Sequence, residues 1–213
     1  MKLLWRTVGP FQENCYLVFD ESTNRAVLVD PGGEPQQLIG MVEASGAGLD
    51  AIWLTHAHID HIGGLAAVRR RWPVPVHLHP ADLPLFERAR MHAAAYGLPF
   101  EQPDEPDVLL SDGDALRAGS LQFDVLHTPG HAPGHVIFRH DDVVIGGDLL
   151  FAGSIGRTDL PLSNPAEMEE SLARICTLGD ATTVYPGHGP RTTVGAERAT
   201  NAFLTGGARL VRR

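Results

Sequence analysis

The stretch THAHIDHIGG, residues 55–64, dominates the chemistry of this sequence. Four of its side chains are of types that commonly bind metals: His56, His58, Asp60 and His61. They follow the apolar run AIWL at residues 51–54, which is typical of a buried strand, so we expect them together on the loop at its end. Imidazole and carboxylate groups suit zinc and similar metals, and one tetrahedral ion cannot easily use all four. The stretch therefore favours two ions.

The alternative interpretation is a chance cluster of histidines at a strand end. Three histidines and an aspartate in six positions are a high local density for a chain with 11 histidines among 213 residues. Metal binding is therefore the better explanation of the pattern.

Composition excludes several classes of function. A chain of 213 residues can bury a core without cross-links, and its cysteines, Cys15 and Cys176, fit a reducing compartment. Residues 1–14 contain no apolar run long enough for a signal peptide or a membrane span. We therefore expect a cytoplasmic protein that does not enter a membrane. With 17 basic and 26 acidic residues the net charge is −9, so nucleic acid is not an expected partner.

Short apolar runs alternate with helix-forming stretches along the whole chain, which indicates an α/β layering. Strands are expected at 16–19, 26–30, 51–54, 75–79, 121–126, 136–138, 143–145 and 182–185. Helices are expected at 38–44, 65–72 and 167–176. Between the two halves, residues 80–105 show helical stretches that we expect to be broken by Pro84 and Pro99.

Three further potential ligands lie beside glycine or proline at expected strand ends: His131, Asp148 and His188. With the first cluster they make seven, which is the number for two ions if Asp148 bridges them. We assign one trio to the first ion and one to the second: His56, His58 and His131; Asp60, His61 and His188. These ligand types fit two divalent ions, zinc foremost, with iron or manganese as alternatives.

The THAHIDH motif, the three later ligands and the early VDPGG at 29–33 resemble the metallo-β-lactamase superfamily over nearly the whole chain. The segments VGPFQENCY (8–16), GSIGRTDLP (153–161) and GHGPRTTVGAERATNAFL (187–204) are most similar to short bacterial hydrolases related to glyoxalase II. The resemblance implies an αββα sandwich with the metal site at one edge between its two sheets. It also implies a single domain, 1–213, without the C-terminal helical domain of longer glyoxalase II enzymes.

The function implied by this resemblance is hydrolysis of a thioester, S-D-lactoylglutathione, to D-lactate and glutathione. Two ions in one site can activate a water and polarise a carbonyl, and Asp60 is expected to orient that water as well as bind metal. Arg157 matches a basic position that contacts glutathione in the family, with a salt bridge to Asp159 as the alternative. The rival function is a persulfide dioxygenase that holds one iron through three residues: His56, His131 and Asp148.

Other polar residues receive supporting roles. The resemblance places Asp30 beside the metal loop as a hydrogen-bond acceptor, with a turn cap as the alternative. His135, four residues after His131, could support that loop. Five histidines are expected to be structural or solvated: His77, His79, His92, His127 and His140. Cys15 and Cys176 are expected to act as small apolar residues.

Overall fold

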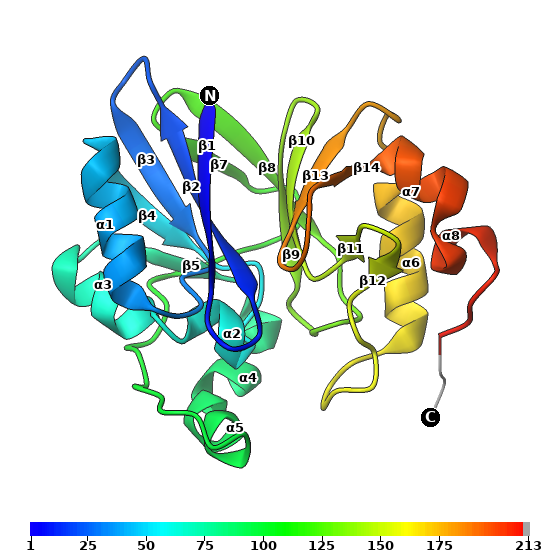
Figure 1. The fold of residues 1–213 in the computed structure, drawn as a ribbon, viewed down its shortest axis with the longest axis horizontal. Helices are drawn as coiled ribbons and strands as arrows, with labels where there is room; N and C mark the ends of the chain where they lie inside the picture. Colours follow the sequence, from blue (N-terminus) through cyan, green and yellow to red (C-terminus); the bar gives the residue numbers. More distant parts are fainter. Residues whose placement is uncertain (211–213) are drawn as a thin grey trace.

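The structure is a computed structural model and describes residues 1–210. Within those residues, two six-stranded sheets pack face to face, with helices against both outer faces (Figure 1). The first sheet has the strand order β1-β2-β3-β4-β5-β6. Its strands are β1 (Lys2–Val8), β2 (Glu13–Asp20), β3 (Arg25–Val29), β4 (Gly48–Trp53), β5 (Val76–Leu78) and β6 (Val108–Leu109). This arrangement is the αββα sandwich that the resemblance to the metallo-β-lactamase superfamily implies.

The second sheet has the order β14-β13-β10-β9-β8-β7. Its strands are β7 (Ala115–Ala118), β8 (Leu121–His127), β9 (Val136–His140), β10 (Val143–Gly147), β13 (Thr183–Pro186) and β14 (Thr192–Thr193). A small hairpin lies beside it, formed by β11 (Leu150–Phe151) and β12 (Ser154–Ile155).

Helices cover the sheets and one edge of the sandwich (Figure 1). The helices are α1 (Pro35–Ser45), α2 (Ile59–Ile62), α3 (Leu65–Arg71), η1 (Pro80–Asp82), α4 (Leu83–Glu87), α5 (Ala89–Ala95), α6 (Pro165–Ile175), α7 (Val194–Thr200) and α8 (Ala202–Thr205). Helices α1 and α3 lie on the outer face of the first sheet, and α6 to α8 lie on the outer face of the second (Figure 1). None of the helices in residues 1–210 combines the length and apolarity needed to cross a membrane.

Strand direction explains why one edge of the sandwich collects functional side chains. Strands β3, β4, β5 and β6 run parallel, as do β10 and β13, so the loops that follow them emerge at shared edges. Between the sheets, Trp53 of β4 packs against two rings of the second sheet, Phe123 at 5.4 Å and Phe138 at 5.2 Å between centroids. This buried contact fixes the end of β4, from which the loop with His56 and His58 departs.

Two local expectations are wrong. The sequence suggested a loop throughout the first ligand cluster, but Asp60 and His61 lie on the single helical turn α2. It also suggested a helix break at Pro84, whereas Pro84 lies in the first turn of α4. A proline there removes no hydrogen bond, because the first amides of a helix have no partner within it.

Candidate metal centre

All seven sequence-predicted ligands meet at one edge of the sandwich, on loops from both sheets. They are His56 and His58 after β4, Asp60 and His61 in α2, His131 between β8 and β9, Asp148 after β10 and His188 after β13. The three candidate ligands of the second half of the chain therefore follow strands, as the sequence predicts.

The side chains form overlapping trios whose potential ligand atoms lie within 4.8 Å of one another. The trios are His56, His58 and His131; Asp60, His61 and His188; and His56, His61 and Asp148. The Asp148 carboxylate lies between the first two: its Oδ2 is 3.4 Å from Nε2 of His131 and 3.5 Å from Nε2 of His188. Its Oδ1 is 3.4 Å from Nε2 of His61. The geometry thus matches the two groups expected from the sequence.

Unpaired buried atoms point to a cation at this place. Nε2 of His56, Nε2 of His61 and Oδ1 of Asp148 are buried without a hydrogen-bond partner. Buried polar atoms are nearly always paired, because an unpaired one costs about 1–3 kcal/mol. Imidazole nitrogens and carboxylate oxygens are ligands for zinc, iron and manganese. The residues present therefore fit divalent metal ions.

Burial keeps one side of the cluster neutral. It lowers the pKa of His56 well below the ordinary value. It also lowers the pKa of His58, with help from His131, to about 3. Burial lowers the pKa of His131 as well. Neutral imidazole is the form that binds metal, so these three histidines are ready to bind without losing protons.

Carboxylates dominate the other side. Burial opposes protonation of His61, but Asp148 and Asp30 outweigh it and raise the pKa of His61 well above the ordinary value. Burial likewise opposes protonation of His188, but Asp148 and Asp60 raise its pKa to about 9. A metal ion that binds here must displace protons from these two histidines.

Hydrogen bonds behind the ligands aim the imidazole rings. The Asp30 carboxylate accepts from Nδ1 of His61 at 3.0 Å and from the Thr55 amide at 2.7 Å, which confirms its expected role as an acceptor. In neutral His131, Nδ1 donates to the Arg157 carbonyl at 2.8 Å. A carbonyl can only accept, so Nε2 of His131 keeps its lone pair and faces the cluster.

His188 is held in the same way. In the neutral ring, Nδ1 donates to the Phe11 carbonyl at 3.1 Å, which leaves Nε2 as the acceptor atom. Phe11 lies in the loop between β1 and β2, far from His188 in the sequence. The main chain of that loop therefore positions a potential ligand from the other sheet.

Asp82 is a supporting residue that sequence reasoning missed. Its buried carboxylate accepts the backbone N–H of Ala57, at 2.8 Å, and of Gly134, at 2.5 Å. Ala57 lies between two candidate ligands and Gly134 lies in the loop of His131, so Asp82 ties the two loops together. In the sequence, Asp82 looks only like a residue near a helix start.

His135 was considered from the sequence as a support for its loop, and the structure confirms this. Its Nε2 accepts a hydrogen bond from the Asp148 amide at 2.9 Å, and its Nδ1 bonds with the Thr128 hydroxyl at 2.9 Å.

Gly187 lets the main chain after β13 approach the Asp148 carboxylate closely, since an added Cβ would lie 2.2 Å from Asp148 Oδ1. The backbone thus packs directly against this carboxylate.

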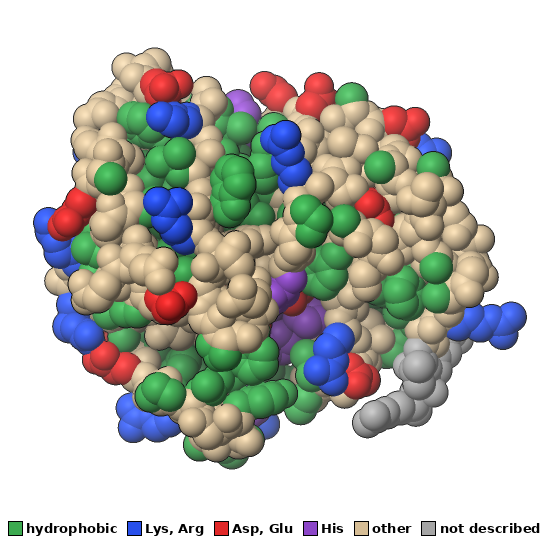
Figure 2. Space-filling view, viewed as in Figure 1, with side chains coloured by type: hydrophobic (Ala, Val, Ile, Leu, Met, Phe, Trp, Pro, Cys, Tyr) green, Lys and Arg blue, Asp and Glu red, His purple; other side chains and the backbone are tan. Residues whose placement is uncertain are grey.

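The cluster opens into a pocket of about 530 Å³. In Figure 2, histidine side chains show in a hollow with hydrophobic side chains gathered along one side.

Arg157 lines the pocket and pairs with Asp159 through two contacts, Nε to Oδ1 at 2.8 Å and Nη2 to Oδ2 at 2.9 Å. The alternative salt bridge expected from the sequence is therefore present, and a contact of Arg157 with substrate stays a prediction.

Comparison with known proteins decides the family. The sequence profile of the Metallo-beta-lactamase superfamily matches residues 8–188. The chain belongs to the metallo-β-lactamase superfamily.

Known proteins are similar to this one over nearly the whole chain. Probable metallo-hydrolase YqgX of Bacillus subtilis is 39% identical over 208 residues, covering 95% of this chain and 98% of YqgX. Hydroxyacylglutathione hydrolase GloC of Haemophilus influenzae is 37% identical over 202 residues, covering 92% of this chain and 95% of GloC. The crystal structure of TTHA1623 in a di-iron-bound form has a TM-score of 0.87 and 46% identity, over 94% of this chain and 100% of that one. The expected family and fold are confirmed.

Proposed function

We propose that this protein is a metal-dependent hydrolase that uses two divalent ions to cleave acyl thioesters, with S-D-lactoylglutathione as a substrate. The observation that carries the proposal is the convergence of seven ligand side chains around buried, unpaired nitrogen and oxygen atoms. Similarity to GloC, whose name denotes hydrolysis of hydroxyacylglutathione, supports the substrate class. We further propose that residues 1–213 act as one domain in the cytoplasm.

The proposed ligand sets follow the two trios. His56, His58 and His131 would hold one ion, Asp60, His61 and His188 the other, and Asp148 would contact both. Ions held there would lower the pKa of a bound water and polarise a carbonyl group. The donor set accepts zinc, iron or manganese; we propose zinc, and the di-iron form of TTHA1623 makes iron the main alternative.

The chain's own residues then orient the reactants. Asp60 lines the pocket and lies 3.3 Å from Nε2 of His188, so its carboxylate can also accept a hydrogen bond from an attacking water. The hydrogen bonds to Asp30, Phe11 and Arg157 hold the imidazoles in place before substrate arrives. A thiolate is a good leaving group, because a free thiol has a pKa of about 8.5, so no separate acid is needed.

Arg157 is proposed as the contact for one carboxylate of glutathione. The side chain lines the pocket and 65% of it is exposed, so it can exchange Asp159 for a carboxylate of the substrate. A guanidinium binds carboxylates through paired hydrogen bonds, as it does with Asp159 here.

Metal analysis combined with two activity assays tests this function. We expect about two metal ions per chain and cleavage of S-D-lactoylglutathione, and we expect both to be strongly reduced in Asp60→Asn. Asp114→Asn is the matched control, because Asp114 accepts the Ser111 backbone amide at an exposed turn and is not among the residues of the cluster or its pocket. Oxygen consumption with glutathione persulfide, one iron per chain and no thioester cleavage would identify a dioxygenase instead.

A further inference from the structure

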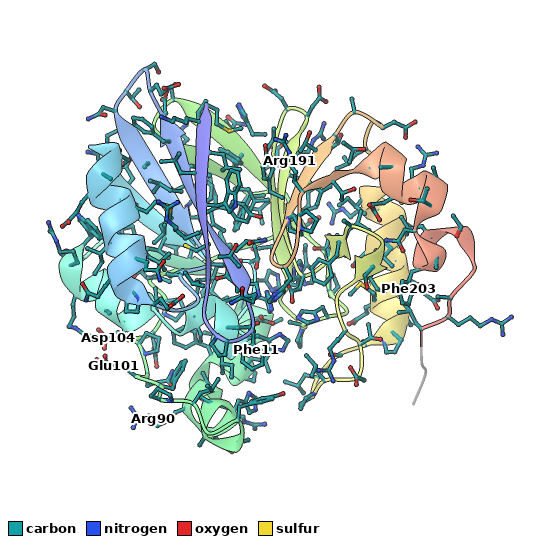
Figure 3. All side chains as sticks on the ribbon, viewed as in Figure 1. Phe11, Arg90, Glu101, Asp104, Arg191 and Phe203 are labelled. Carbon is teal, nitrogen blue, oxygen red and sulfur yellow. The ribbon has the colours of Figure 1, made fainter. Side chains whose placement is uncertain are left out.

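An aromatic pair stands at the mouth of the metal pocket. Phe11 lies at the tip of the β1–β2 loop, on the side of the molecule that carries α5 (Figure 3). Its ring meets the ring of Tyr96, which ends α5, edge to face with 5.4 Å between centroids. Both rings line the pocket, and they are 38% and 57% exposed. Their exposure leaves aromatic surface available to a ligand.

The pocket wall beside this pair is apolar. Besides the metal cluster, its lining residues include Ile59, Leu85, Ala95, Phe151, Leu160 and Pro161. Since the reacting carbonyl must reach the metal cluster at the floor, the mouth receives the part of the substrate farthest from that carbonyl. With a small acyl group, that part is the thiol portion.

The pocket has few basic side chains to pair with the charged groups of glutathione. Among the lining residues outside the metal cluster, the basic side chains are Arg157 and His92. Arg157 already pairs with Asp159 and can serve one carboxylate by exchange. Glutathione has two carboxylates and an ammonium group, each of which loses hydration against an apolar wall. An uncharged thiol portion meets no such cost.

We infer that the Phe11–Tyr96 pair forms a binding subsite for an uncharged alkyl or aryl group on the thiol side of the substrate. This inference rests on the proposed thioester hydrolysis and narrows its substrate class. The enzyme therefore accepts apolar thioesters with a lower KM than glutathione thioesters of the same acyl group.

The loop that carries Phe11 also supports the metal cluster, so a test of its ring must keep its main chain. The main-chain carbonyl of Phe11 bonds with His188, so Phe11→Ala removes the ring and retains that carbonyl. Met91→Ala is the matched control: Met91 is also in α5 and is 60% exposed, and it is not among the residues that line the pocket.

The kinetic test compares S-benzyl thioacetate with S-acetylglutathione, which share one acyl group. We expect Phe11→Ala and Tyr96→Ala each to raise KM for the benzyl ester about ten-fold, with kcat within about two-fold, because an aromatic contact contributes uniform binding. The KM for S-acetylglutathione should change less than about three-fold, and Met91→Ala should change neither. Tyr96→Phe keeps the aromatic ring, so its KM for the benzyl ester should stay close to that of the wild type.

Binding of thioethers tests the subsite without catalysis. By calorimetry, S-benzyl-N-acetylcysteamine should bind the metal-loaded enzyme about ten-fold more tightly than S-methyl-N-acetylcysteamine, a difference in binding free energy of about 1.4 kcal/mol. Phe11→Ala should abolish this difference in affinity. Equal binding of the two thioethers, or equal changes in KM for both esters, would overturn the subsite. A wild type that cleaves no thioester would refute the proposed hydrolysis, while the thioether measurement would still decide the subsite.

Discussion

Replacement of Asp82 by alanine should weaken both the fold and the metal centre. The Asp82 carboxylate, 0% exposed, is the acceptor for the amides of Ala57 and Gly134. These amides belong to the two loops that carry His56, His58 and His131. Without the carboxylate, both amides stay buried and lose their partner, and the loops lose their connection.

The magnitude follows from the two hydrogen bonds. A hydrogen bond to a charged group contributes about 1.5–3 kcal/mol, so the pair contributes on the order of 3–6 kcal/mol. Burial of the charged carboxylate offsets part of this stabilisation. Its effect on the pKa of Asp82 is larger than that of the two amide hydrogen bonds, and it raises that pKa to about 6. We therefore expect Asp82→Ala to lower the free energy of unfolding by about 3 kcal/mol, a large part of the ~5–15 kcal/mol of a typical domain.

Urea unfolding of the metal-free protein measures the stability, and competition with a chromophoric chelator measures zinc affinity. We expect zinc affinity to fall at least about ten-fold, as for other residues that orient metal ligands. Asp107→Ala is the control, because Asp107 accepts the Val76 amide at the other end of β5 and pairs with Arg69 at 2.8 Å. It should leave zinc affinity unchanged. Stability of Asp82→Ala within about 0.5 kcal/mol of wild type, with full zinc affinity, would refute the reasoning.

Three further outcomes are expected. Asp148→Ala should abolish activity while the circular dichroism spectrum stays that of the folded protein. An active variant with full metal content would contradict the proposed contact of Asp148 with both ions. Arg157→Ala should raise KM for S-D-lactoylglutathione about ten-fold with little change in kcat, since a charged contact is worth about 1.5–3 kcal/mol. An unchanged KM would leave Arg157 with no role beyond its salt bridge with Asp159. Burial and the stacked ring of His127 lower the pKa of His79 to about 4 in the folded protein. In the unfolded chain the pKa of a histidine is about 6.5, so the unfolded chain takes up this proton at a higher pH. The stability of the metal-free protein should therefore fall as the pH drops from about 6.5 to 4. His79→Phe should make that fall less steep in urea unfolding, with His56 and His58 supplying the rest, and an unchanged pH profile would exclude a contribution from His79.

Local sequence patterns determined much of the fold and the identity of the candidate ligands. The run at 51–54 predicted the end of β4, and the spacing of His56 to His61 placed four potential ligands together by covalent proximity alone. Strand ends marked by glycine or proline indicated His131, Asp148 and His188. These signals are readable because residue type, period and neighbours within a few positions carry them.

Tertiary structure alone decided how those ligands are held. Asp82 and Ala57 are 25 positions apart, and Phe11 and His188 are 177 apart, so no local pattern relates them. The supports from Phe11 and Arg157 are main-chain carbonyls, which every residue type possesses and which therefore leave no trace in the sequence. The packing of two sheets brings these distant loops to one edge, and it is this packing that turns separate histidines into a single centre.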